Sequence, residues 1–285
     1  MIRIKVITFL GLLVALEACT KNSPVEEQDN TSVLPGGPAE NKTDWWKPKA
    51  GISFDWNLEV ANQSDVYTTD VVDVDAFETT KEMVTALHAK GKKVIAYVSV
   101  GTLENTRTDG NLLPVEVIGN IYPEWPEEKW LDIHQLDKMK PWLINRFTMI
   151  QKKGFDAIEP DNIDGYSATN TGFSISLDDT KKFCDYIITL SHQMGLGIGQ
   201  KNVGELAIDY SSKFDWALTE DAFNQGWQDN MKPYIIQNKP VFAVEYTDQT
   251  DQQFFSSVIC PKAKAMKYSA ILKKRHIDKW VVFCN

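Results

Sequence analysis

Hydrophobic and polar positions along the chain follow two alternating patterns. Short runs rich in β-branched and aromatic residues are typical of buried strands, and longer runs with apolar residues every three or four positions are typical of helices. The short runs predict eight strands, at 51–56, 66–72, 93–100, 155–162, 196–203, 214–220, 240–246 and 279–284. The longer runs predict helices at 79–90, 130–153, 178–194, 204–212, 222–237 and 251–274.

Eight strands alternating with helices predict an α/β fold, a single-domain (β/α)8 TIM barrel, because parallel strands joined by helices close into a barrel at this number. Glycines follow three of the predicted helices, at Gly91, Gly154 and Gly195, where a left-handed residue commonly ends a helix. The alternative is an open, doubly wound sheet. That fold would carry a glycine-rich phosphate loop after an early strand, and the sequence has none.

The N-terminal segment has the pattern of an export signal. Two basic residues precede an apolar run over 6–16, which is too short to span a bilayer but has the length of a signal-peptide core. The run ends in LEAC at 16–19, which resembles a lipobox, where the cysteine is acylated. We therefore expect residues 1–18 to be removed and Cys19 to carry a lipid that anchors the protein to a membrane. Ordinary cleavage with an unmodified Cys19 is the alternative.

Residues 19–44 are polar, contain proline and glycine, and lack apolar periodicity, which predicts a flexible tether. The expected organisation is a lipoprotein signal peptide at 1–18, a tether at 19–44 and a barrel domain at 45–285. An exported, membrane-anchored lipoprotein at the cell surface or in the periplasm follows from this organisation.

Composition limits the classes of function that the chain can have. The chain has 285 residues and a net charge of −9, so it lacks the clustered basic face that nucleic-acid binding requires. The four histidines are scattered and no cysteine pair has zinc-ligand spacing, so we expect no metal, no cofactor and a monomer. Cys184 lies in an apolar helical run and is expected to be a buried thiol. Export permits a disulfide between Cys260 and Cys284, with two free thiols as the alternative.

Catalytic groups of such barrels lie at the carboxyl ends of the strands. The predicted strand ends are rich in carboxylates and amides and poor in histidine and nucleophilic serine. Two carboxylates on different strands suit glycoside hydrolysis, where one protonates the leaving oxygen and the other attacks or activates water. Asp161 and Glu220 each occupy the last position of the inward face of their strand, which predicts that they face each other across the mouth. Glu159, two residues deeper, is the main competitor.

Other residues at the predicted mouth are candidates for substrate binding. Aromatic rings there could stack on sugars, with core packing as the alternative, and polar groups could bind hydroxyls or brace the barrel. These candidates are Asp55, Trp56, Asp75, Tyr97, Ser99, Glu104, Glu159, Asn162, Asp164, Tyr166, Lys201, Asn202, Glu245 and Tyr246.

An ordered set of motifs carries a family resemblance. The motifs occur in the order of the family: YVS at 97–99 with GTLENTRTD at 101–109, WLDI at 130–133, GFDAIEPDNIDGY at 154–166, KN at 201–202, FD at 214–215, TE at 219–220 and VEY at 244–246. Over 45–284 the chain resembles glycoside hydrolase family 114, the endo-α-1,4-polygalactosaminidases. The resemblance implies a (β/α)8 barrel in which Asp161 is the nucleophile and Glu220 the acid/base.

The resemblance also implies a substrate, an α-1,4-linked galactosamine polymer that is wholly or partly deacetylated and therefore cationic. The acidic side chains at the predicted mouth, among them Asp73 and Asp75, should attract it. Asp55 departs from the glutamine frequent at that position in the family, which bears on substrate choice. Two alternatives remain, a surface glycan-binding lipoprotein without turnover and a hydrolase of another amino-sugar exopolysaccharide.

Overall fold

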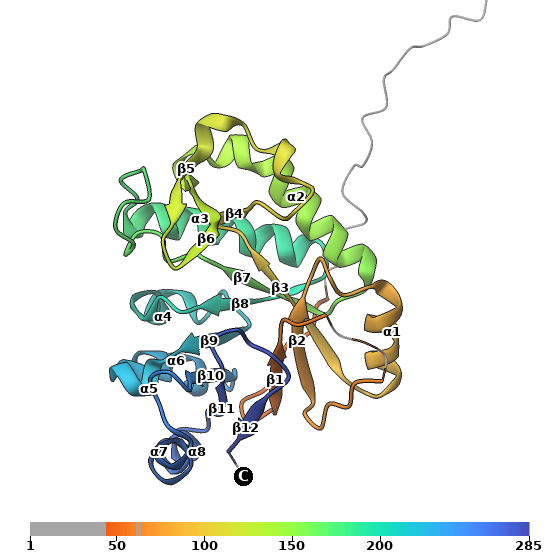
Figure 1. Cartoon of the computed structure of the whole chain (residues 1–285), viewed down its shortest axis with the longest axis vertical. Coiled ribbons are helices and arrows are strands. Elements are labelled where there is room, and N and C mark those ends of the chain that lie inside the picture. The colour runs from red at the N-terminus through yellow and green to blue at the C-terminus, as the bar shows by residue number, and fades with distance from the viewer. Residues whose placement is uncertain (1–43, 61, 63, 285) are drawn as a thin grey trace, which may run out of the picture. The chain divides into compact units, whose positions relative to one another are not determined.

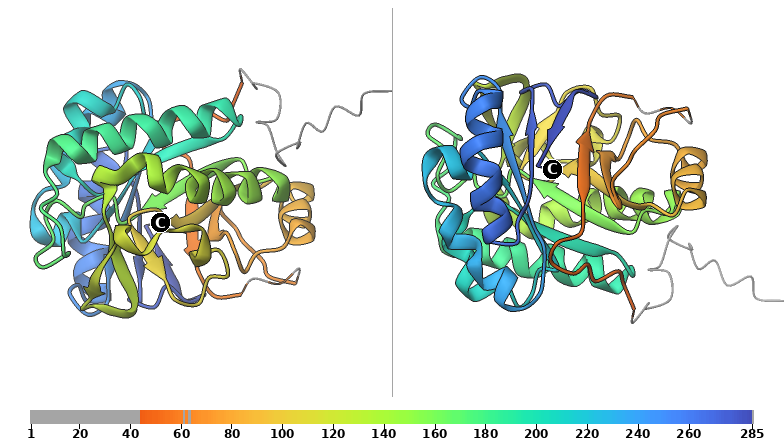
Figure 2. Two further views of the ribbon diagram at one scale, coloured as in Figure 1. Left: turned by 90° about the horizontal axis from the view of Figure 1, so that it is seen from above. Right: turned by 90° about the horizontal axis from the view of Figure 1, so that it is seen from below.

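The computed structural model describes residues 44–60, 62 and 64–284. The predicted signal peptide, Cys19 and the tether up to residue 43 lie outside these residues. The described chain forms a nearly closed barrel surrounded by helices, which Figures 1 and 2 show from three sides. The fold predicted from the sequence is confirmed.

The barrel has eight parallel strands in sequential order, followed by one antiparallel strand. The parallel strands are β1 (Phe54–Asn57), β2 (Val71–Asp75), β3 (Lys93–Ser99), β7 (Ala157–Asp161), β8 (Gly197–Lys201), β9 (Trp216–Glu220), β10 (Val241–Tyr246) and β11 (Ser269–Lys273). The ninth strand is β12 (Val281–Phe283), which pairs with β11. All eight parallel strands therefore end on the same side of the barrel.

Helices lie on the outside of the barrel. They are α1 (Lys81–Ala89), α2 (Leu136–Lys153), α3 (Leu177–Gln193), α4 (Ala207–Tyr210), α5 (Ala222–Gln225), α6 (Lys232–Ile236), α7 (Gln252–Phe254) and α8 (Cys260–Ala265). A π-helical segment, Phe255–Ile259, joins α7 to α8, and short 3₁₀ turns lie at Gly110–Leu112, Val115–Val117, Ile133–Gln135, Gly204–Leu206 and Gln228–Met231. Between 204 and 237 the predicted helices are thus broken into short pieces.

Alternate side chains of each strand point into the barrel or out to the helices. The inner layer is aromatic and aliphatic, and it includes Trp56, Ile95, Trp216 and Phe242. Gly199 on β8 makes room for the Trp216 indole, because a Cβ at Gly199 would lie 2.5 Å from ring atoms. The barrel interior is therefore a packed core below its carboxyl-end mouth.

The barrel is not closed by a ladder between β1 and β11. Instead the segment before β12 lies beside β1, where the Leu58 N–H donates to the Ile277 carbonyl at 3.0 Å. At the other end of the same seam, Ser269 Oγ donates to the Ile52 carbonyl at 2.6 Å. A disulfide bond joins Cys260 on α8 to Cys284 after β12, and Cys184 is a buried free thiol.

A strand does lie within 279–284, but its predicted place as the eighth parallel strand was wrong. Residues 279–284 contain β12, which is antiparallel, whereas the eighth parallel strand is β11, inside the predicted helix 251–274. The helix ends near Lys267, which adopts the left-handed conformation with φ of 60°. Because lysine rather than glycine occupies this position, the sequence carries no visible stop signal there.

The prediction of a helix from residue 130 was also wrong at its start. Trp130 and Leu131 end β6 (Trp125–Leu131), and α2 begins only at Leu136. β6 pairs with β4 (Thr102–Glu104) and β5 (Ile118–Tyr122) in a separate antiparallel sheet. In Figure 1 this β4–β6–β5 sheet stands beside the barrel, on the side of α2 and α3. Within the described residues no helix is long and apolar enough to cross a membrane.

Substitution of Gly199 tests the inner packing. Gly199→Ala is expected to lower the free energy of unfolding by about 1–3 kcal/mol, because overpacking a tight core forces its neighbours to shift. Denaturant unfolding followed by tryptophan fluorescence measures the change. Gly165→Ala is the control, since its new Cβ would meet its nearest neighbour at an ordinary 3.4 Å. Equal stability of the two variants would contradict this account.

Candidate active site

A cavity of about 1080 Å³ opens at the carboxyl ends of the strands. Both predicted catalytic residues line it, together with most of the predicted binding residues. The predicted residues in the lining are Trp56, Asp75, Tyr97, Glu104, Asp161, Asn162, Asp164, Tyr166, Lys201, Asn202, Glu220 and Tyr246.

Asp161 ends β7, Glu220 ends β9, and both contact the ammonium group of Lys201, which ends the strand between them. Lys201 Nζ lies 2.9 Å from Asp161 Oδ1 and 3.3 Å from Glu220 Oε2. The two oxygens are therefore at most about 6 Å apart, the value reached if all three atoms were in line. Two carboxyl groups this close can act on the same bond of a bound molecule.

Each carboxylate is also held by a tyrosine. The hydroxyl of Tyr97 donates to Asp161 Oδ2 at 2.8 Å, and the hydroxyl of Tyr246 donates to Glu220 Oε1. Asn202 Nδ2 donates to the other oxygen of Glu220 at 2.9 Å. Burial raises the pKa of Glu220, but Lys201, Tyr246 and Asn202 together outweigh it, so the pKa is lowered overall. The contacts of Glu220 thus favour its ionised form.

The residue after each of these three charged groups adopts the left-handed conformation. Asn162, Asn202 and Asp221 follow Asp161, Lys201 and Glu220, with φ of 62°, 50° and 51°. Asn and Asp tolerate this conformation better than other non-glycine residues. The chain therefore turns sharply as soon as each charged side chain has been placed.

Four predicted binding residues lie outside the cavity lining, and other groups surround each of them. One of the four, Glu159, lies deeper in the barrel. Asp55 lies 3.6 Å from Lys273 at the seam between β1 and β11. Ser99 Oγ donates to Asn162 Oδ1 at 2.9 Å and so braces the loop after β7. Glu245 is fully buried and accepts the N–H groups of Phe223 and Asn224, at the start of α5.

Two further acidic residues lie deeper than the mouth. Glu159 is fully buried below Asp161, and its Oε1 lies 2.8 Å from Lys201 Nζ. Asp73 was expected at the mouth, but it lies within β2 and is fully buried. The predicted strand ended at residue 72, whereas β2 continues to Asp75, so Asp73 points into the barrel.

The cavity is strongly acidic. Its lining includes nine Asp and Glu side chains but only three Lys and Arg side chains, Arg107, Lys201 and Arg275. Burial and the nearby charge of Asp161 raise the pKa of Asp164 to about 6. Burial raises the pKa of Glu128 to about 7, and a hydrogen bond from Thr102 partly opposes this effect. Negative charges crowded in one partly dry space favour a cationic ligand.

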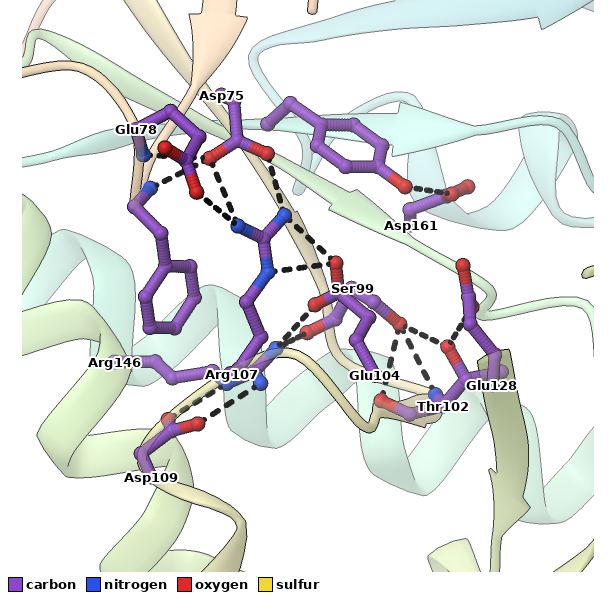
Figure 3. Close-up of polar contacts among 12 residues, drawn as sticks. Asp75, Glu78, Ser99, Thr102, Glu104, Arg107, Asp109, Glu128, Arg146 and Asp161 are labelled. Atoms are coloured by element: carbon purple, nitrogen blue, oxygen red, sulfur yellow. Dashed lines mark hydrogen bonds and ion pairs between the residues drawn. The ribbon is translucent and has the colours of Figure 1, made fainter.

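An arginine network supports one wall of the cavity. Figure 3 shows Arg107 between Asp75 and Glu104, to whose carboxylates it is ion-paired. Arg146 on α2 is fully buried, and it binds Asp109 through Nε at 2.9 Å and Nη2 at 3.1 Å. Its Nη1 also contacts Glu104 at 3.3 Å. The loop after β3 is thereby tied to β2 on one side and to α2 on the other.

Sequence reasoning missed the part of the cavity formed by the β5–β6 hairpin. Tyr122, Glu124, Trp125 and Glu128 from this hairpin line the cavity. Trp125 meets His276, from the β11–β12 loop, with ring centroids 6.2 Å apart. The run 118–131 alternates poorly and contains two prolines, so the one available signal was the turn at Pro123-Glu124.

The ring of His134 contacts Asp132 at 2.7 Å and Asp179 at 2.9 Å. Across residues 44–60, 62 and 64–284, no group of three or more His, Cys, Asp or Glu side chains is arranged to hold a metal ion.

Comparisons with known proteins identify the family. The profile of glycoside-hydrolase family GH114 matches residues 36–285, most of the chain. The chain belongs to glycoside-hydrolase family GH114. No curated protein matches the sequence.

Among solved structures, that of Aspergillus fumigatus Ega3 in complex with galactosamine is similar, with a TM-score of 0.78 and 28% identity over 86% of this chain and 100% of that chain. The glycoside hydrolase domain of PelA from Pseudomonas aeruginosa shares the fold, with a TM-score of 0.63 and 12% identity over 83% of this chain and 99% of that chain.

The hydroxyl of Tyr246 can be tested for its effect on Glu220. A hydrogen bond to the charged form of a carboxyl lowers its pKa. Tyr246→Phe is therefore expected to raise the pKa of Glu220 by about one to two pH units, given about 1.5–3 kcal/mol for such a bond. A carbon-13 NMR titration of the Glu220 carboxyl measures this pKa. Tyr166→Phe is the control, because Tyr166 bonds Glu205 instead. An unchanged pKa in Tyr246→Phe would refute the assignment.

Proposed function

We propose that this chain is an endo-acting hydrolase of α-1,4-linked galactosamine polymers, with Asp161 as nucleophile and Glu220 as acid/base. The proposal rests on one observation, the contact of both carboxylates with the single ammonium group of Lys201 at the floor of the cavity. The two oxygens that contact Lys201, Asp161 Oδ1 and Glu220 Oε2, are at most about 6 Å apart. Retaining glycosidases have carboxyl groups about 5–5.5 Å apart and inverting ones about 6.5–9.5 Å, which favours retention.

In the proposed first step, Asp161 attacks the anomeric carbon while Glu220 gives its proton to the departing glycosidic oxygen. Tyr97 holds Asp161 for this attack, and Lys201 stabilises the charge that Glu220 acquires. In the second step, Glu220 takes a proton from water, which attacks the anomeric carbon and releases Asp161. Because the contacts of Glu220 lower its pKa, its acid form is most abundant under acidic conditions.

The acidity of the cavity supports a cationic substrate. Free amines on a deacetylated galactosamine polymer carry positive charge, and the nine carboxyl groups of the lining would attract them. The similarity to Ega3, whose structure was solved with galactosamine, supports the same choice of sugar. Other acidic groups of the lining, such as Glu124 and Glu205, would then bind amines of neighbouring sugar units.

The catalytic assignment predicts that Asp161→Asn and Glu220→Gln each lower the rate about 10²–10⁴-fold while the fold persists, because each removes a group that acts in bond cleavage. A reducing-end assay on α-1,4-galactosamine polymers of graded acetylation measures the rate, and mass spectrometry identifies the products. NMR of the first products distinguishes retention from inversion.

Asp209→Asn serves as the control, because Asp209 lies on α4 with an exposed side chain and pairs only with Lys181 at 3.4 Å. Near wild-type turnover by either catalytic variant would disprove the assignment. A wild-type protein that binds these polymers without cutting them would instead be a glycan-binding lipoprotein, and cleavage of a different amino-sugar polymer would correct the substrate.

We also propose that the protein is exported and anchored by a lipid on Cys19. The support lies in the sequence alone, in the apolar run at 6–16 and the LEAC segment at 16–19. Cys19→Ser is expected to abolish incorporation of labelled fatty acid and to shift the protein from the membrane to the soluble fraction. Cys184→Ser is the matched control. Unchanged labelling of Cys19→Ser would place the lipid elsewhere or exclude it.

A further inference from the structure

A second pair of carboxyl groups lies directly beneath the catalytic pair. Asp73 on β2 and Glu159 on β7 are both fully buried, and they lie close enough for each to shift the pKa of the other. Three of their four carboxyl oxygens, both of Asp73 and Oε2 of Glu159, accept no hydrogen bond from any other described residue. Neither residue lines the cavity, and the proposed chemistry uses neither of them.

The fourth oxygen connects this pair to the catalytic residues. Glu159 Oε1 lies 2.8 Å from the ammonium nitrogen of Lys201, which also contacts Asp161 and Glu220. An ammonium group has three N–H donors, and here three carboxylates surround it. The same ammonium lies over the ring of Trp56, 4.7 Å from its centroid. Glu159 thus holds Lys201 from below while the catalytic carboxylates hold it from above.

A proton between Asp73 and Glu159 accounts for the unpaired oxygens. Two buried carboxyl groups this close do not both ionise, because their like charges repel and the one nearby ammonium, that of Lys201, already contacts three carboxylates. Asp73 makes no ion pair with Lys201, whereas Glu159 does. If Asp73 keeps the proton, its O–H donates to Glu159 Oε2, and Glu159 stays ionised beside the ammonium. If Glu159 kept the proton instead, Asp73 would be a buried anion and Lys201 would lose an ionic partner.

Other charged and titratable groups act on both carboxyls of the pair. Lys201 from β8 favours ionisation of both carboxyls, while Asp161 from β7 opposes it. Tyr97 from β3 is also close to Glu159. Burial and then the charge of Glu159 raise the pKa of Asp73 well above its usual value, while burial raises that of Glu159 to about 7.

We propose that Asp73 is a positioning residue, a neutral carboxylic acid whose O–H orients Glu159, which in turn holds Lys201 in contact with both Asp161 and Glu220. Asp73 does not touch the substrate. Its effect on turnover rests on the proposed function, whereas its protonation state does not.

The test compares two substitutions of Asp73. Asp73→Asn keeps a neutral donor of the same shape toward Glu159, so its kcat is expected to stay within about threefold of wild type. Asp73→Leu has a similar size but no donor, so its kcat is expected to fall about 10–100-fold with little change in KM, as for a catalytic group displaced by less than 1 Å. Asp70→Asn, at the start of the same strand region and exposed, controls for an Asp-to-Asn change outside the barrel interior.

Infrared spectroscopy provides a readout that does not depend on activity. At about pH 9, where carboxyl groups with a pKa of about 7, such as Glu128 and Glu159, are ionised, wild type is expected to show the carbonyl stretch of a buried, protonated carboxylic acid. Asp73→Asn is expected to lose this band while Asp70→Asn keeps it. Absence of the band in wild type, its persistence in Asp73→Asn, or equal kcat values for Asp73→Asn and Asp73→Leu would overturn the proposal.

The test still gives an answer if Asp73→Leu does not fold or if the wild type is inactive. If Asp73→Leu fails to fold, the kcat of Asp73→Asn and the infrared band still decide the matter, because a large loss of kcat in folded Asp73→Asn also contradicts the proposal. If wild type cleaves no galactosamine polymer, the proposed function fails. The infrared comparison then still tests whether Asp73 carries the proton.

Discussion

One buried ammonium group organises the floor of this barrel. Lys201 is almost fully buried, and a buried cation is tolerated only when anions or other good partners surround it. Its partners are Glu159, Asp161 and Glu220, which come from β7 and β9, the two strands on either side of its own. The requirement to neutralise Lys201 therefore brings the carboxylates of these two strands together at the floor of the cavity.

Strand periodicity was sufficient to predict part of this site. Asp161 and Glu220 end runs of inward-facing positions, so their common cavity followed from counting residues. The role of Lys201 did not follow, because its shared contacts depend on distances between three strands. Asp73 was misplaced because an acidic residue after Val72 looks like the end of a strand. β11 was missed because Ala270, Ile271 and Leu272 follow a helix that ends without glycine. The β5–β6 hairpin was missed because two prolines interrupt its alternation of apolar and polar residues.

In the unliganded protein, the crowding of carboxyl groups in the cavity is electrostatically unfavourable. Asp164 and Glu128 have raised pKa values because they are buried among other carboxyl groups. Arg107 and Arg146 offset part of this repulsion on the side of β2 and β3, where they pair with Asp75, Glu104 and Asp109. Toward the β5–β6 hairpin, Glu124 and Glu128 have no comparable arginine network in the described part of the chain. Functional sites commonly hold such unfavourable arrangements, which a complementary ligand then relieves.

The left-handed turns at Asn162, Asn202 and Asp221 mark where the barrel strands end and the loops begin. Each charged side chain belongs to the last residue held by the barrel ladder, and the backbone leaves the cavity floor immediately afterwards. The residue directly after each turn is still buried, but the loops that follow belong to the class of segments that generally vary more than strands. Changes in these loops can therefore reshape the rim of the cavity while Asp161, Lys201 and Glu220 keep their mutual geometry. For protein engineering, these three turns are the positions after which a loop can be replaced without moving the strand ends.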